Sequence, residues 1–220
     1  MSMSIADLQS LIGVNPDGVW GAKSQAVFAE HFSNRQANGL NEADFAAAAS
    51  RLGCTVAQIK AVRQVEAAAS GFDALGRPKI LFERHKFHRF TGGRFSVCYF
   101  SNPKGGGYGT DSWEKLNGAI ATGSVDAAFM SCSWGAFQVM GQYWSDLGYP
   151  SPYALAWTCV QSEGDHLELM VRYVEHFGLA DELRALSADP ATCRAFAAAY
   201  NGPGYRENAY DTKLAKAMER

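Results

Sequence analysis

The spacing of apolar residues predicts a mainly helical chain. Over most of its length apolar residues recur every three or four positions, which is the period of an amphipathic helix. Beyond residue 41 this spacing predicts helices at 42–52, 55–70, 112–121, 138–147, 163–177, 192–200 and 210–218. Gly53 can end the first of these helices, Thr55 can cap the second, and Gly71 can end it.

The segment 71–110 interrupts this helical pattern. It contains eight glycines and two prolines, which predicts a long loop or a small β region. The residues most typical of strands within it lie at 79–82 and 94–100. The basic stretch at 84–89 is expected to be a solvated loop that could be attracted to a negatively charged surface.

The first 36 residues form a separate pattern. Four apolar residues have the spacing of one helix face: Ile5, Leu8, Leu11 and Ile12. A turn at 15–18 follows, and a second short helix would carry residues 26–28. The polar segment 33–41 is the best linker candidate, so we expect a small helical unit over 1–36 and a larger domain over 37–220.

Composition and charge exclude several classes of protein. The chain has 220 residues, 47% of them hydrophobic and 19% charged, as in an ordinary globular protein. With a formal net charge of -2 there is no basic field, and we expect no nucleic-acid partner. No apolar run reaches the roughly 18 residues of a membrane span, so we expect no membrane insertion. The N-terminus lacks the features of a secretory signal, so we expect folding in a cytoplasm.

The chain offers no pattern typical of metal or cofactor chemistry. Its five cysteines are scattered without a CxxC pair, and we expect them to be reduced thiols. His85 and His88 have no evident third ligand and no HExxH motif. The glycine-rich run at 105–109 lacks the Gly-Lys-Ser/Thr ending of a phosphate-binding loop. We therefore expect neither a metal nor a cofactor.

Glu66 is the first residue with the features of a catalytic acid. It shares one helix face with four apolar residues: Val56, Ile59, Val62 and Ala69. A carboxyl group on that face is desolvated and lies near the negative end of the helix dipole, and both effects raise its pKa. The alternative is a half-buried glutamate paired with Arg63 or Arg77.

Two further segments could line a groove for sugars. Gln138 lies in an apolar stretch, 133–141, between two glycines that would allow close approach. Tyr200 and Asn201 lie where a predicted helix ends, and could place a phenol and an amide at a groove rim. The alternatives are a core helix with an incidental glutamine and an ordinary helix end at Asn-Gly.

These segments together carry a family resemblance. A glutamate at a helix end followed by Ser-Gly, then Gly-x-x-Gln, then Ala-Tyr-Asn-Gly, resembles the goose-type lysozyme and soluble lytic transglycosylase group of the lysozyme-like fold. The closer resemblance is to the N-acetylmuramidase domains of bacteriophage endolysins. The matching stretches are 62–72, 76–87, 133–141 and 199–205.

The resemblance implies a role for each matching position. Glu66 would protonate the glycosidic oxygen of a bacterial peptidoglycan strand. The residues that would hold the sugar are Gln138, Tyr200, Asn201 and Ser133. The serine that usually follows the catalytic glutamate is replaced by Ala67, so its sugar contact is absent or is supplied by Ser70.

A second catalytic carboxylate is not evident from the sequence. An inverting pair of carboxyl groups is separated by about 6.5–9.5 Å and a retaining pair by about 5–5.5 Å. Glu83, Asp73 and Asp111 lie in or near the glycine-rich segment, and Glu83 is our first choice. The alternatives are a structural ion pair of Glu83 with Arg84, Lys86 or Arg89, or a mechanism without a second carboxylate.

The N-terminal unit resembles part of a helical peptidoglycan-binding module, one helix short. The residues that carry this resemblance, and that would bind the wall, are Gln9, Asp17, Gly18 and Trp20. The alternative is that the unit is a structural cap on the catalytic domain.

The sequence therefore predicts a monomeric muramidase that cleaves the β-1,4 bond between N-acetylmuramic acid and N-acetylglucosamine. A lytic transglycosylase would use the same Glu66, with the 6-hydroxyl of the sugar in place of water. A protein that binds the wall without cutting it is the alternative from another class. The resemblance implies a phage endolysin that is held in the host cytoplasm until the membrane is permeabilised, although an exported effector would look the same.

Overall fold

The computed structural model describes residues 2–66 and 70–219, and it is mainly α-helical as predicted. The helices are α1 (Ile5–Leu11), α2 (Ala22–His31), α3 (Glu42–Leu52), α4 (Val56–Glu66), α5 (Arg84–Phe90), α6 (Ser112–Ala121), α7 (Val125–Met130), α8 (Pro152–Thr158), α9 (Glu163–His176), α10 (Ala180–Arg184), α11 (Pro190–Asn201) and α12 (Tyr210–Met218). None of the helices in these described ranges is long and apolar enough to cross a bilayer.

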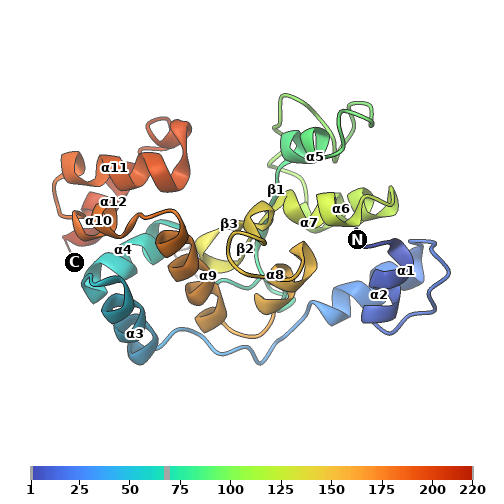
Figure 1. Cartoon of the computed structure of the whole chain (residues 1–220), viewed down its shortest axis with the longest axis horizontal. Helices are drawn as coiled ribbons and strands as arrows, with labels where there is room; N and C mark the ends of the chain where they lie inside the picture. Colours follow the sequence, from blue (N-terminus) through green and yellow to red (C-terminus); the bar gives the residue numbers. More distant parts are fainter. Residues whose placement is uncertain (1, 67–69, 220) are drawn as a thin grey trace.

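A small antiparallel sheet lies between the helices (Figure 1). Its strands are β1 (Ile80–Phe82), β2 (Cys132–Trp134) and β3 (Val139–Met140), in that order. Ile80 pairs with Trp134, and Ser133 pairs with Met140. The short 3-10 helix η1 (Gly135–Phe137) joins β2 to β3, and a second, η2 (Gly141–Tyr143), follows β3. The sheet thus connects the glycine-rich segment to the stretch around Gln138.

Most predicted helices are confirmed to within two residues, as is the strand at 79–82. The predicted strand at 94–100 is wrong, because these residues form bends and irregular loop. The predicted helix at 138–147 is also wrong: Gln138 has a left-handed φ of 51°, which no right-handed helix accommodates, and β3 and η2 follow it. α4 ends at Glu66, and the rest of the predicted 55–70 helix includes residues 67–69, which lie outside the described residues.

The basic stretch expected to be a loop is instead the helix α5. Its Phe87 is fully buried and packs against Phe82, Phe95 and Phe100, at ring-centroid distances of 5.9, 5.6 and 5.6 Å. These aromatic contacts give α5 and the loop after it a small apolar core. One buried aromatic residue is enough to anchor a short helix, but it leaves no periodic apolar pattern in the sequence.

The N-terminal helices share the hydrophobic core of the rest of the chain. The ring of Phe28 lies 6.0 Å from Trp113 and 6.2 Å from Phe129, and Phe32 lies 6.1 Å from Trp134. These contacts bury α2 against residues that lie about a hundred positions further along the chain. The division of the chain after residue 36 remains a prediction about folding units.

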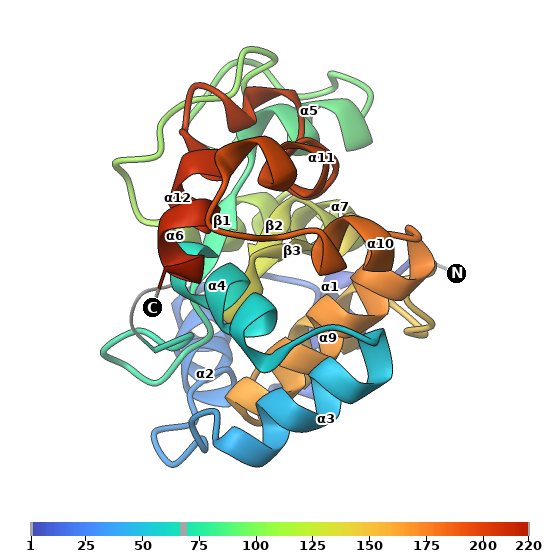
Figure 2. The same ribbon diagram turned by 90° about the vertical axis from the view of Figure 1, so that its left-hand side faces the viewer.

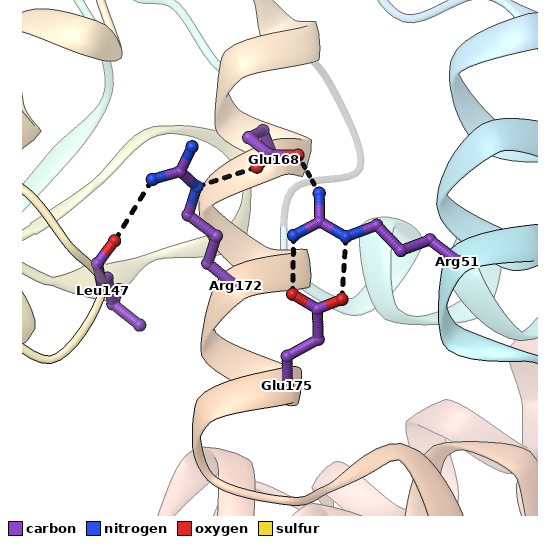
Figure 3. Close-up of polar contacts among 5 residues, drawn as sticks. All are labelled: Arg51, Leu147, Glu168, Arg172 and Glu175. Atoms are coloured by element: carbon purple, nitrogen blue, oxygen red, sulfur yellow. Dashed lines mark hydrogen bonds and ion pairs between the residues drawn. The ribbon is translucent and has the colours of Figure 1, made fainter.

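A network of ion pairs joins α3 to α9 (Figure 3). Arg51 makes two hydrogen bonds to Glu175, of 2.7 and 2.6 Å, and one to Glu168, of 2.8 Å. Arg172 donates to the other carboxylate oxygen of Glu168 at 2.8 Å and to the carbonyl oxygen of Leu147 at 3.2 Å. These partly exposed bonds are individually weak, but they fix the position of α9, whose first turn supports the site.

Candidate active site

Glu66 lies at the C-terminal end of α4, where α12 packs against this helix (Figure 2). The buried Tyr210, at the start of α12, donates its hydroxyl hydrogen to Oε1 of Glu66. Burial raises the pKa of Glu66 to about 7, although the bond from Tyr210 acts in the opposite direction. A substantial fraction of Glu66 therefore carries a proton near neutral pH, as a general acid requires.

Two strained backbone positions flank the residues of this site. In the described part of the chain, Gln138 and Ala209 are the non-glycine residues with positive φ, at 51° and 50°. Such a conformation costs of the order of 1–2 kcal/mol for a residue with a Cβ atom. Ala209 directly precedes Tyr210, so both strained positions orient side chains at the site, where such strain is typically found.

Contacts within the protein fix the amide of Gln138. Its Oε1 accepts a hydrogen bond of 2.7 Å from Ser133 Oγ. Its Nε2 donates to the carbonyl oxygens of Gly135, at 2.8 Å, and Lys79, at 3.3 Å. Oε1 retains capacity for one further donor, so Gln138 can accept a hydrogen bond from a sugar hydroxyl or amide. Ser133 is buried, and its hydrogen bond orients the amide of Gln138.

Tyr200 and Asn201 end α11. The hydroxyl group of Tyr200 donates to the carbonyl oxygen of Phe137 at 2.8 Å, and its ring stacks on Phe196 at 5.2 Å. Burial holds the pKa of Tyr200 well above its usual value, so the phenol stays protonated. Asn201 is exposed and free to approach a ligand.

Gln138 lines two open cavities. One cavity, of about 420 Å³, is lined by Glu66 together with Asp73, Asp111 and Gln138. The other, of about 430 Å³, is lined by Gln138 with Tyr200 and Asn201. The structure therefore places Gln138 beside both the glutamate of one cavity and the Tyr-Asn corner of the other.

The candidate second carboxylates differ in their surroundings. Glu83 lines neither cavity; its Oε2 accepts from Tyr108 Oη at 2.9 Å and lies 3.2 Å from His85 Nδ1. Its partner is thus His85 rather than one of the three basic residues considered from the sequence. In the Glu66 cavity, Asp73 is bound by Arg77 Nε at 2.8 Å, and the exposed Asp111 caps α6.

Ser70 contacts a buried acid that sequence reasoning missed. Its hydroxyl group donates to Glu163 Oε1 at 2.9 Å; Gly71 N donates to the same oxygen, and Arg63 Nη2 lies 3.1 Å from Oε2. Burial raises the pKa of Glu163, but the bonds from Gly71, Arg63 and Ser70 outweigh it and hold that pKa below its usual value. Glu163 therefore stays ionised and anchors the chain just beyond residues 67–69. Its only sequence signal was a place in the first turn of a helix.

A buried histidine supports the Gln138 segment from the other side. Ala136 N donates to His166 Nδ1 at 3.1 Å, and His166 Nε2 lies 2.6 Å from the carbonyl oxygen of Cys159. This pattern requires a neutral imidazole with its hydrogen on Nε2, in agreement with burial, which lowers the pKa of His166. A Cβ atom on Gly71 would lie 2.5 Å from His166 Nδ1, so only glycine allows this packing.

The N-terminal residues that resembled a wall-binding motif mostly bond to one another. Gln9 is 0% exposed; its Nε2 donates to Asp17 Oδ1 at 2.8 Å, and its Oε1 accepts from Gly18 N at 2.8 Å. Trp20 is buried and donates to Asn117 Oδ1 at 3.0 Å. The motif thus closes the turn between α1 and α2 and attaches it to α6. Asp17 and Gly18 remain exposed, and wall binding by this unit stays a prediction.

The described residues contain no cluster of three or more His, Cys, Asp or Glu side chains that could hold a metal. All five cysteines are free thiols, three of them buried.

Comparison with known proteins finds similarity to one protein family and to solved structures. The family model for N-acetylmuramidase matches residues 55–220. The crystal structure of the Burkholderia AP3 phage endolysin has a TM-score of 0.74 and 30% sequence identity to this chain, and the match covers 100% of this chain and 96% of that one. No curated protein sequence matches.

Proposed function

The chain belongs to the N-acetylmuramidase family and is a peptidoglycan hydrolase, and we propose that Glu66 is its catalytic acid. The observation that carries this proposal is a half-buried carboxyl group whose pKa is raised to about 7, in a cavity that Gln138 also lines. The sequence motifs had predicted the same family.

Glu66 donates its proton to the oxygen between N-acetylmuramic acid and N-acetylglucosamine. Because Tyr210 occupies Oε1, the transferable proton is on Oε2. Positive charge develops on the muramic acid ring as the bond breaks, and water completes the hydrolysis. Gln138 and Asn201 hold the sugars on either side of this point. Ser133 fixes the amide of Gln138, and Tyr200 fixes the backbone at Phe137.

A catalytic role for Glu83 has weaker support, because its carboxylate is bound to Tyr108 and His85 outside the two cavities. Glu83→Gln tests that role. If Glu83 activates the water, this variant loses most of the activity, whereas a structural residue leaves most of it in place.

Mass spectrometry of the fragments released from purified peptidoglycan, before and after borohydride reduction, tests the proposal. Wild type should release fragments with reducible muramic acid ends, Glu66→Gln should release none, and the surface variant Glu30→Gln should behave like wild type. Anhydro ends that resist reduction would make the protein a lytic transglycosylase that uses the same site. If wild type released nothing, the hydrolytic assignment would fail and a wall-binding protein would remain.

We further propose that the protein acts in host cell lysis, because the solved structure to which it is similar over its whole length is that of a phage endolysin. On this proposal it acts as a monomer, remains in the host cytoplasm and reaches the peptidoglycan once the membrane is permeabilised. Expression in a bacterial host with and without a pore-forming protein tests it: lysis should require both proteins and an intact Glu66.

A further inference from the structure

The segment from α5 to the start of α6 carries an uncompensated positive charge. Between residues 84 and 110 there are five Lys or Arg residues and no Asp or Glu. Because the whole chain has a net charge of -2, the remaining residues together carry -7. None of these five side chains forms an ion pair within the described part of the chain.

Two of these cations converge on one neutral oxygen. Lys86 Nζ and Arg89 Nη2 both donate to Gln142 Oε1, at 3.2 and 3.4 Å. The two residues are three positions apart on α5, and therefore share a face of the helix. Lys86 also lines the cavity of Tyr200 and Asn201. Two positive charges thus lie at the rim of this cavity, both bound to the amide oxygen of Gln142.

The charges around this pair do not cancel it. Burial lowers the pKa of Lys86, and repulsion from Arg89 lowers it further, whereas the attraction of Glu83 is weaker. Glu83 is itself bound to His85 and Tyr108. Like charges held together without a counterion raise the free energy of the protein, and a bound anion would relieve that repulsion.

We propose that Lys86 and Arg89 form a binding site for a carboxylate of the peptide stem that muramic acid carries. This inference rests on the proposed function, because a stem reaches the rim only when its glycan lies along the two cavities. Arg89 supplies a planar fork suited to a carboxylate and Lys86 supplies a point charge, while Gln142 holds the pair in place. The preferred substrate is then glycan that still bears its peptides.

Cleavage of two matched substrates tests this site. The first is glycan chains with their peptide stems, and the second is the same chains after an amidase has removed the stems. Wild type should have a higher kcat/KM on the stem-bearing chains. The double variant Lys86→Gln/Arg89→Gln should lower the ratio of kcat/KM on stem-bearing chains to kcat/KM on stripped chains. We expect a decrease of about 5–10-fold, since each partly exposed charge-assisted bond contributes modestly. Raising the salt concentration should lower the wild-type ratio in the same direction.

Lys104→Gln is the matched control, since it removes one exposed positive charge from the same segment outside the cavity. It should keep the wild-type ratio, and Arg89→Lys should retain more of that ratio than Arg89→Gln does. An unchanged ratio in the double variant, or an equal loss in Lys104→Gln, would overturn the stem site while leaving the muramidase assignment intact.

A binding measurement separates this inference from the proposed function. In the Glu66→Gln background, calorimetry should find stem-bearing chains bound about 5–10-fold more weakly once Lys86 and Arg89 are also replaced by Gln. Failure of wild type to cleave either substrate would overturn the proposed function. The calorimetric comparison would then decide the stem site by itself.

Discussion

Removal of the Tyr210 hydroxyl group should move the pH dependence of the enzyme to higher pH. This hydroxyl donates to Glu66 Oε1 and stabilises the carboxylate form, so the pKa of about 7 lies below the value that burial alone would give. A hydrogen bond to a charged group is worth about 1.5–3 kcal/mol, and one pKa unit corresponds to about 1.36 kcal/mol. Tyr210→Phe should therefore raise the pKa of Glu66 by about 1–2 units.

The activity of the variant should change in two ways. Because Glu66 acts in its protonated form, the alkaline limb of the kcat/KM profile should shift upward by the same 1–2 pH units or so. The maximum rate should fall by about 10-fold, since Oε1 loses the contact that orients the carboxyl group and the acid becomes weaker.

The assay is the initial rate of release of reducing ends from soluble glycan chains between pH 5 and 10. Tyr205→Phe is the matched control, because its hydroxyl group contacts Arg206 in the same part of the chain and not Glu66. An alkaline limb that stays in place while the maximum falls would refute the role of the hydroxyl group in tuning the pKa. A limb that moves to lower pH would refute the sign of the argument.

Three further predictions concern stability. The pKa of Glu66 is raised from 4.5 to about 7 on folding, so folding stability decreases as pH rises through this window. The change in unfolding free energy caused by Glu66→Gln should thus be more favourable at pH 8 than at pH 4 by about 1–3 kcal/mol. Urea unfolding that finds no such pH dependence would contradict the desolvation of this group. Glu163→Gln should cost about 2–3 kcal/mol, because it removes a buried negative charge that pairs with Arg63 Nη2 at 3.1 Å. The more exposed control Glu175→Gln should cost less than about 1 kcal/mol in the same urea unfolding. Equal losses would count against the buried network. Arg51→Met should cost about 0.5–1 kcal/mol at low salt and less at 1 M salt, and a loss that salt does not change would mean that packing rather than charge is removed.

Local patterns were sufficient for the long helices and for the order of the site residues. The apolar spacing of α3, α9 and α12 is regular, because each helix buries one face against the core. The same periodicity placed Glu66 on an inward face at a helix end, and the motifs around Gln138 and Tyr200 came from short contiguous stretches. A prediction that depends only on neighbours a few residues apart can be made from the sequence.

Contacts between distant segments decided the rest. Glu66 is 144 positions from Tyr210, and Gly71 is 92 positions from Glu163. The strands β2 and β3 are only three and two residues long, so no alternation of apolar and polar residues marks them. A single buried aromatic residue stabilises α5. The sequence alone thus indicated that Glu66 faces the interior, because burial of a helix face is a local pattern, but it missed the buried Glu163. Only the tertiary structure decided which groups bind and tune that acid, because hydrogen-bond partners depend on how the helices pack.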